Sequence, residues 1–173
     1  MNKNLILTGM MGVGKSTVGK KLAEKLKLKF VDIDKIIEKK EKSTIKEIFK
    51  KKGENYFRKT EKQITMDELK KNNSVIALGG GAFLNKLVRK EIKDSAVSFW
   101  LDLDPKSLLL RLKNVEKRPL LNKENLEESI NRIYSERKKI YNESNFRIKC
   151  NSENIGETIR KIIKLYESSE NRS

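Results

Sequence analysis

One stretch near the start of the sequence has the residue types that bind phosphate groups. Residues 9–16 read Gly-Met-Met-Gly-Val-Gly-Lys-Ser and match the pattern G-x-x-x-x-G-K-[ST] in full. In this pattern, backbone N–H groups turn inward around phosphate oxygens, the lysine reaches the β- and γ-phosphates, and the hydroxyl binds Mg²⁺. A glycine-rich turn without a ligand is the alternative, but the Lys15-Ser16 pair between an apolar run and a helical stretch favours a phosphate site.

Two aspartates end the second apolar run, in Phe-Val-Asp-Ile-Asp at residues 30–34. Residues two apart on a strand point to the same face, so we expect Asp32 and Asp34 to project together from the strand end. Asp34 could instead be the N-cap of a helix that begins near Lys35, but this leaves the charge of Asp32 without a partner. We therefore predict that Asp32 holds Mg²⁺ through water and that Asp34 accepts a hydrogen bond from a substrate hydroxyl.

Three consecutive glycines, Gly79, Gly80 and Gly81, follow the third apolar run. They cost backbone entropy and exceed what a turn requires, although a plain loop is still an open interpretation. We expect that their lack of side chains lets a ligand approach the main chain and its N–H donors.

Nine of the 40 basic residues are arginines, and two of these have informative neighbours. Arg137 lies four residues after Ile133 and three before Ile140, on the apolar face of a predicted helix. It is either a side chain at the edge of the core or a guanidinium presented to a buried anion. Arg58 has Glu61 one turn later, a spacing that fits a surface ion pair or a guanidinium fixed for a ligand.

A third arginine, Arg118, precedes Pro119 in a stretch of weak periodicity. We expect residues 113–123 to form a mobile lid between two helices. An arginine that closes with such a lid could supply charge to a transferring phosphoryl group.

Short apolar runs alternate with helical segments, which indicates an α/β fold with a parallel sheet covered on both faces. Ligands of such sheets bind beyond the carboxyl ends of the strands, where the residues above are found. Thr44 and Glu47 form a capping box at the start of one helix, and Gly53 is expected to break it. The predicted strands are 4–8, 30–33, 74–78, 96–101 and 146–150.

Composition narrows the class of protein. The 173 residues suit one domain, and 40 basic against 24 acidic side chains give a net charge of +16. The lysines are spread along the chain without an aromatic platform, so we expect no nucleic-acid partner. With no histidine, one cysteine and no apolar run of membrane-spanning length, we expect a cytoplasmic protein without imidazole chemistry, disulfides or a membrane partner.

Together these motifs resemble those of the shikimate kinase family, over essentially the whole chain. The matching segments, besides residues 9–17, are Val-Asp-Ile-Asp (31–34), Phe-Arg-Lys-Thr-Glu (57–61), Ala-Leu-Gly-Gly-Gly-Ala-Phe (77–83), Lys-Arg-Pro-Leu-Leu (117–121) and Arg-Ile-Tyr-Ser-Glu-Arg-Lys-Lys-Ile-Tyr (132–141). The resemblance implies a three-layer P-loop kinase fold whose five-stranded parallel sheet has the order 2-3-1-4-5. Residues 1–167 would form this single domain, and 168–173 a disordered polar tail.

The resemblance also implies a reaction, the transfer of the ATP γ-phosphoryl group to the 3-hydroxyl of shikimate, and a role for each matching residue. Asp34 would act as base toward that hydroxyl, with Lys15 and Arg118 as the other catalytic residues. Arg58 and Arg137 would bind the shikimate carboxylate, and Gly79, Gly80 and Gly81 its ring. Mg²⁺ would be held by Ser16 directly and by Asp32 through water. The residues implied in ATP binding are Gly12, Val13, Gly14, Lys15, Ser16, Thr17, Arg111, Arg118 and Ile155, the last at a position where the family often has proline.

The sequence leaves two alternative functions open. A P-loop kinase for another small hydroxylated acid, such as gluconate, would differ only in the shape of its acceptor pocket. A basic nucleic-acid-binding module that uses ATP as a switch would bind RNA with a steep salt dependence. The resemblance to the shikimate kinase family implies a monomer.

Overall fold

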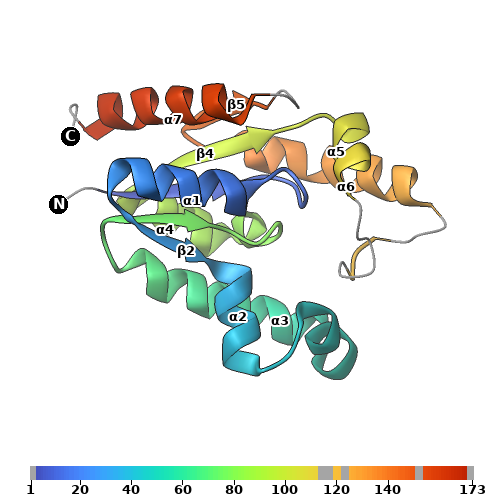
Figure 1. The fold of residues 1–173 in the computed structure, drawn as a ribbon. Helices are drawn as coiled ribbons and strands as arrows, with labels where there is room; N and C mark the ends of the chain where they lie inside the picture. The colour runs from blue at the N-terminus through green and yellow to red at the C-terminus, as the bar shows by residue number, and fades with distance from the viewer. Residues whose placement is uncertain (1–2, 113–118, 122–124, 151–153, 171–173) are drawn as a thin grey trace.

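The computed structural model describes residues 3–112, 119–121, 125–150 and 154–170. Its centre is one five-stranded sheet with the order β2-β3-β1-β4-β5, and every pair of neighbouring strands is parallel (Figure 1). This confirms the predicted fold class and strand order. The strands are β1 (Asn4–Thr8), β2 (Lys29–Asp32), β3 (Ser74–Ala77), β4 (Ala96–Asp102) and β5 (Phe146–Lys149).

Helices cover both faces of the sheet, as expected for a parallel sheet (Figure 1). Helices α1 and α7 pack together, as do α3 and α4, while α6 packs against α5 and the short 3₁₀ helix η1. The helices are α1 (Lys15–Leu26), α2 (Ile33–Glu41), α3 (Ile45–Leu69), η1 (Ala82–Leu84), α4 (Lys86–Ser95), α5 (Pro105–Arg111), α6 (Leu126–Tyr141) and α7 (Ile155–Glu170).

The core lies on the central strands. Every residue of β1, β3 and β4 is buried, whereas the edge strands β2 and β5 are only partly buried. Such strands have no solvent face, which explains why they read as continuous apolar runs in the sequence. Their carboxyl ends therefore stand on a rigid base and position the loops that follow.

Helix α3 has the start and the break that the sequence predicts. Thr44 caps it by accepting a hydrogen bond from the Glu47 N–H, and the Glu47 carboxylate accepts one from the Thr44 N–H at 2.8 Å. Gly53 has φ 80° and ψ 168°, so it divides the helix into two segments. The second segment carries Arg58 toward the carboxyl ends of the strands.

The prediction of a disordered tail from residue 168 is wrong for Ser168, Ser169 and Glu170. Helix α7 continues through Glu170, where both serine hydroxyls donate to carbonyls within the helix and the Glu170 carboxylate accepts the Lys3 N–H at 3.1 Å. Residues 171–173 lie outside the described residues. None of the described helices is both long and apolar enough to cross a membrane.

Candidate active site

The phosphate-binding loop joins β1 to α1. Gly9, Gly12 and Gly14 have positive φ angles of 134°, 80° and 101°, which favour glycine. A Cβ on Gly9 would also stand 2.5 Å from the Leu101 carbonyl oxygen. No side chain caps α1, so its first N–H groups are available to an anion. The Lys15 ammonium donates to the carbonyls of Gly9 and Met10, at 2.9 Å each, and so lies across this loop.

Ser16 and Asp32 come together at the start of α1. The Ser16 hydroxyl donates to Asp32 Oδ2 at 2.6 Å, so Asp32 has the partner that the sequence left unidentified. Asp32, not Asp34, is the N-cap of α2, because its Oδ1 accepts the Lys35 N–H at 3.3 Å. Asp34 lies in the first turn of that helix rather than on the strand.

This oxygen pair fits Mg²⁺. The metal prefers oxygen ligands and is held in such sites by one or two protein groups together with substrate phosphates. Ser16 contributes a hydroxyl oxygen and Asp32 a carboxylate oxygen to this donor set.

Two cavities adjoin the loop. The first is bounded by residues of the loop, Asp32, Asp34 and Gly80. The second lies between Val13, Cys150 and Ile155, and Arg111 lines both. Arg111 also donates from Nη1 to the Val13 carbonyl at 3.2 Å, so it is fixed beside the loop. The structure thus brings Arg111 and Ile155, which the resemblance implies in ATP binding, to one cavity next to Gly12 and Thr17.

A third cavity lies on the other side of Asp34. Its charged residues are Asp34, Arg58, Glu61 and Arg137, and Gly80 and Gly81 provide backbone. Asp34, Gly80 and Met11 also line the first cavity, which we call the phosphate cavity. These three residues form a wall that is common to the two cavities. The apolar lining consists of Ile45, Phe49, Phe57, Pro119 and Leu120.

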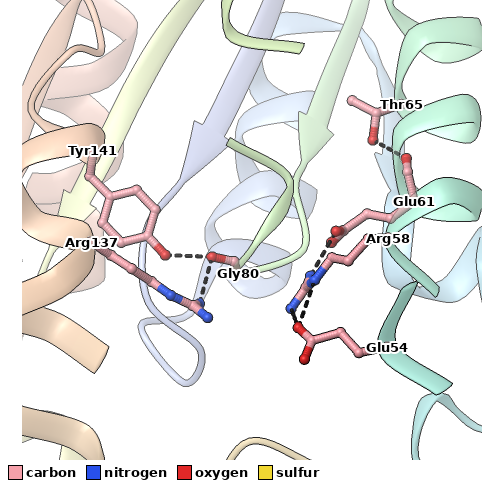
Figure 2. Close-up of polar contacts among 7 residues, drawn as sticks. All are labelled: Glu54, Arg58, Glu61, Thr65, Gly80, Arg137 and Tyr141. Atoms are coloured by element: carbon pink, nitrogen blue, oxygen red, sulfur yellow. Dashed lines mark hydrogen bonds and ion pairs between the residues drawn. The ribbon is translucent and has the colours of Figure 1, made fainter. Parts of the chain in front are cut away.

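Arg58 is held in place by two carboxylates of its own helix (Figure 2). Its Nη1 donates to Glu61 Oε2 at 2.8 Å, and its Nε and Nη2 donate to Glu54 Oε1 at 3.1 Å. Glu61 is 2% exposed, and its Oε1 has no hydrogen-bond partner among the described residues. Burial raises the pKa of Glu61, although the Arg58 guanidinium opposes the shift. The sequence interpretation of a guanidinium fixed by Glu61 is therefore favoured over a surface ion pair.

Arg137 approaches the same cavity from α6. It is 8% exposed and donates from Nη1 to the Gly80 carbonyl at 2.9 Å (Figure 2). The Gly80 carbonyl also accepts a hydrogen bond from the Tyr141 hydroxyl at 2.5 Å. The helix face that buries Arg137 also buries Ile130 and Ile133, as the spacing predicts.

Gly79 and Gly81 are needed for space rather than for conformation, whereas a Cβ on Gly80 would meet nothing closer than 3.6 Å. None of them is among the described residues with positive φ. A Cβ on Gly79 would stand 2.5 Å from Asp34 Oδ1 and would also overlap Glu61 Oε1, while one on Gly81 would overlap the Arg58 guanidinium. The groups that approach the main chain here are therefore the side chains of the site itself.

The three adjoining cavities thus contain all the predicted site residues except two: Gly79 lies beside Asp34 and Glu61 but lines none of these cavities, and Arg118 is outside the described residues. Arg118 and most of the predicted lid, 113–118 and 122–123, lie outside the described residues. The sequence analysis assigned no role to Tyr141 or Glu54. Each lies four residues from an arginine of the site, Tyr141 after Arg137 and Glu54 before Arg58, and this spacing was the available signal.

The sheet order, the G-x-x-x-x-G-K-S loop and the adjoining cavity for a second substrate define a P-loop kinase. Comparison with known proteins narrows this class. The family model for shikimate kinase matches residues 11–167. The chain therefore belongs to the shikimate kinase family, and it is a phosphotransferase that uses ATP.

Individual relatives agree with this assignment. The shikimate kinase of Sulfurihydrogenibium sp. is 43% identical over 161 residues, which cover 93% of this chain and 96% of that protein. The shikimate kinase of Acinetobacter baumannii, solved in complex with shikimate, superposes with a TM-score of 0.93 at 33% identity and covers 98% of this chain and 96% of its own. A gluconokinase from Sinorhizobium meliloti, at 14% identity and a TM-score of 0.63, shares the fold alone.

Proposed function

We propose that this protein transfers the γ-phosphoryl group of ATP to the 3-hydroxyl of shikimate, with the residues of the two adjoining cavities in distinct roles. The observation that carries the proposal is the position of Asp34 on the wall common to both cavities. On one side of it lies the phosphate loop, and on the other lie two arginines suited to a carboxylate. An acceptor that has both a carboxylate and a hydroxyl can bridge the arginines and Asp34.

The arginines orient the acceptor. Arg58 extends from α3 and Arg137 from α6, so a carboxylate between them would receive donors from both sides. Both guanidiniums are already held by protein acceptors, so little side-chain freedom is lost on binding. The aromatic side chains of Phe49 and Phe57 line this cavity and can pack against the apolar face of a ring. Gly80 and Gly81 line this pocket with their backbone, and Gly79 precedes them in the loop.

Asp34 accepts the proton of the 3-hydroxyl as the new oxygen–phosphorus bond forms, and ADP leaves with the electrons of the broken bond. Lys15 moves from the Gly9 and Met10 carbonyls to the β- and γ-phosphates, whose negative charge it neutralises. The N–H groups from Gly12 to Thr17 surround these phosphates.

Mg²⁺ would be bound by Ser16 directly and by Asp32 through water, and when bound it would neutralise charge on the phosphates. The Ser16–Asp32 hydrogen bond supports this assignment because it brings the two oxygens to the edge of the phosphate cavity. Arg111 and Ile155 are assigned to the adenine ring.

Arg118 is assigned to the phosphates as part of a closing segment. Its neighbours Pro119 and Leu120 line the acceptor cavity, which supports a segment that contacts the acceptor. The family resemblance is the basis for proposing a monomeric enzyme. The free, buried Cys150 is in keeping with a reducing cytoplasm.

The test is ADP release from Mg·ATP with shikimate, gluconate or a nucleoside monophosphate as acceptor. We expect turnover with shikimate alone, and ³¹P NMR of the product should show the 3-phosphate. Turnover with gluconate instead would retain the phosphate site and reassign the acceptor cavity. A folded protein that binds ATP but shows no acceptor-dependent turnover, and binds RNA tightly, would support the nucleic-acid switch.

A further inference from the structure

Two side chains of α6, Arg137 and Tyr141, converge on one backbone oxygen. The Gly80 carbonyl accepts Arg137 Nη1 at 2.9 Å and the Tyr141 hydroxyl at 2.5 Å (Figure 2). The two residues are one helical turn apart, so they stand on the same face of α6. A carbonyl oxygen has two lone pairs, and here each is occupied by a donor from the same helix.

We propose that Tyr141 is a positioning residue, whose hydroxyl holds the Gly80 carbonyl so that the glycine loop and Arg137 keep the geometry that the acceptor requires. This inference rests on the proposed function of the cavity. It concerns a residue that contacts neither ATP nor the acceptor cavity directly, since Tyr141 is fully buried and does not line that cavity.

The peptide geometry explains how the hydroxyl acts. In a planar trans peptide, the carbonyl of Gly80 and the N–H of Gly81 point in opposite directions. No described peptide bond is cis. When the Gly80 carbonyl is held toward α6, the Gly81 N–H therefore points away from α6. The neighbouring backbone hydrogen bonds, from the Ala82 N–H to the Gly79 carbonyl at 3.2 Å and from the Leu84 N–H to the Gly81 carbonyl at 3.0 Å, do not involve the Gly80 carbonyl, which is held by the two donors of α6.

Tyr141 is required in addition to Arg137 because Arg137 has a second task. Its guanidinium donates to the Gly80 carbonyl and is also assigned to the acceptor carboxylate. When an acceptor is bound, the position of the Arg137 guanidinium depends on both the acceptor carboxylate and the Gly80 carbonyl. The tyrosine hydroxyl supplies a hydrogen bond to the loop that does not change with the ligand.

The phenol is suited to be a permanent donor. Burial raises the pKa of Tyr141, so the hydroxyl keeps its proton at neutral pH. The ring packs against Trp100, with 6.0 Å between ring centroids, which fixes the direction of the hydroxyl. Replacement by phenylalanine removes one oxygen and retains this packing.

The chain contains a matched control for this substitution. Tyr166 is also buried, at 2% exposed, and its hydroxyl donates to a backbone carbonyl, that of Lys3, at 2.5 Å. Burial raises the pKa of Tyr166 to about 12. This hydrogen bond lies at the amino end of β1, whereas the acceptor cavity lies at the carboxyl ends of the strands. Tyr166→Phe therefore removes the same type of bond without touching the glycine loop.

The experiment compares the two variants with the wild type. For Tyr141→Phe we expect the KM for shikimate to rise about 3- to 10-fold, as for the loss of one neutral hydrogen bond, with the KM for ATP within about 2-fold. Tyr166→Phe should leave both constants unchanged. Both variants should lower Tm, so a lower Tm alone does not support the proposal. An unchanged shikimate KM in Tyr141→Phe would overturn it.

A second readout in the absence of any acceptor separates this inference from the proposed function. In ¹⁵N-labelled protein, the Gly81 amide resonance should shift in Tyr141→Phe and stay in place in Tyr166→Phe. If the wild type does not phosphorylate shikimate, the proposed function fails, and this resonance still decides whether Tyr141 holds the loop. A Tyr141→Phe chain that does not fold, beside a folded Tyr166→Phe, would assign the hydroxyl to folding and also overturn the proposal.

Discussion

Arg58 and Glu61 form a pair in which only one carboxylate oxygen is used. Arg58 Nη1 donates to Glu61 Oε2 at 2.8 Å, while Glu61 Oε1 is buried and has no hydrogen-bond partner in the described part of the chain. The free oxygen lies near Gly79, close to Asp34 Oδ1. A buried carboxylate costs free energy unless its oxygens are paired. Glu61 is therefore retained at a cost to stability, in a position where it fixes the guanidinium that faces the acceptor.

The stability of the protein should depend on pH through Glu61. Its pKa in the folded state is raised above the ordinary value of 4.5, chiefly by burial. As pH rises above that value, the unfolded chain loses this proton first, so the free energy of unfolding falls until the folded state has also ionised. Denaturant unfolding from about pH 4 to pH 8 should show wild-type stability falling relative to Glu61→Gln.

The control for that comparison is Glu54→Gln, which removes an exposed carboxylate bound to the same arginine. It shows what loss of one Arg58 contact does without a change at the buried site. A constant difference between the wild type and Glu61→Gln across this range would contradict the raised pKa.

Arg137→Ala should impair acceptor binding specifically. The loss of a guanidinium that binds a carboxylate is expected to raise the KM for shikimate on the order of 100-fold, with the KM for ATP nearly unchanged. Steady-state kinetics with each substrate varied in turn measures both constants. Arg132→Ala, an exposed residue of the same helix, is the control. An equal loss for both substrates would indicate a structural arginine.

Lys15→Ala should abolish turnover while the fold is retained. We assign the Lys15 ammonium to the β- and γ-phosphates, and its loss is expected to lower kcat on the order of 1,000-fold. Circular dichroism and Tm report the fold, and Lys21→Ala, on the exposed side of α1, is the control. A variant that retains activity would disprove the phosphate assignment of Lys15.

Asp32→Asn should raise the Mg²⁺ concentration needed for half-maximal rate. The amide keeps the size of the side chain and the acceptor for Ser16 but removes the negative charge. A titration of the rate with Mg²⁺ at fixed ATP measures the shift, and chelation of the metal should stop wild-type turnover. Equal Mg²⁺ dependence in the two proteins would place the ion elsewhere.

Gly81→Ala should raise the KM for shikimate more than the KM for ATP. A Cβ at this position would overlap the Arg58 guanidinium, which must move away from the cavity. The substitution does not require a positive φ, so we expect the chain to fold. A crystal structure of the variant would show the displacement, and an unmoved Arg58 would refute this explanation.

The fold and most of the site could be predicted because their signals are local. Strand positions followed from apolar runs, and the break at Gly53 and the cap at Thr44 from single residues. The phosphate loop is a contiguous motif, so its geometry was available before the structure. The resemblance to a family supplied the strand order, which local patterns do not encode.

The contacts across the fold could not be predicted in the same way. The role of Asp32 as N-cap depends on β2 ending at Asp32, one residue earlier than expected, and its contact with Ser16 joins the start of α2 to the start of α1. Tyr141 reads as an apolar residue of a helix face, and its hydroxyl acquires a partner only when α6 meets the glycine loop. The end of α7 was misjudged because its polar residues pair with carbonyls and with Lys3, which composition does not reveal.

The placement of Arg58 on α3 and Arg137 on α6 has a consequence for the bound state. A carboxylate held by both would connect two helices that are far apart in the sequence and meet the glycine loop from opposite sides. The acceptor would thus act as a reversible cross-link within the chain, and it would stabilise the folded state in proportion to the logarithm of its concentration above Kd. Substrate availability would then set the lifetime of the protein as well as its rate of turnover.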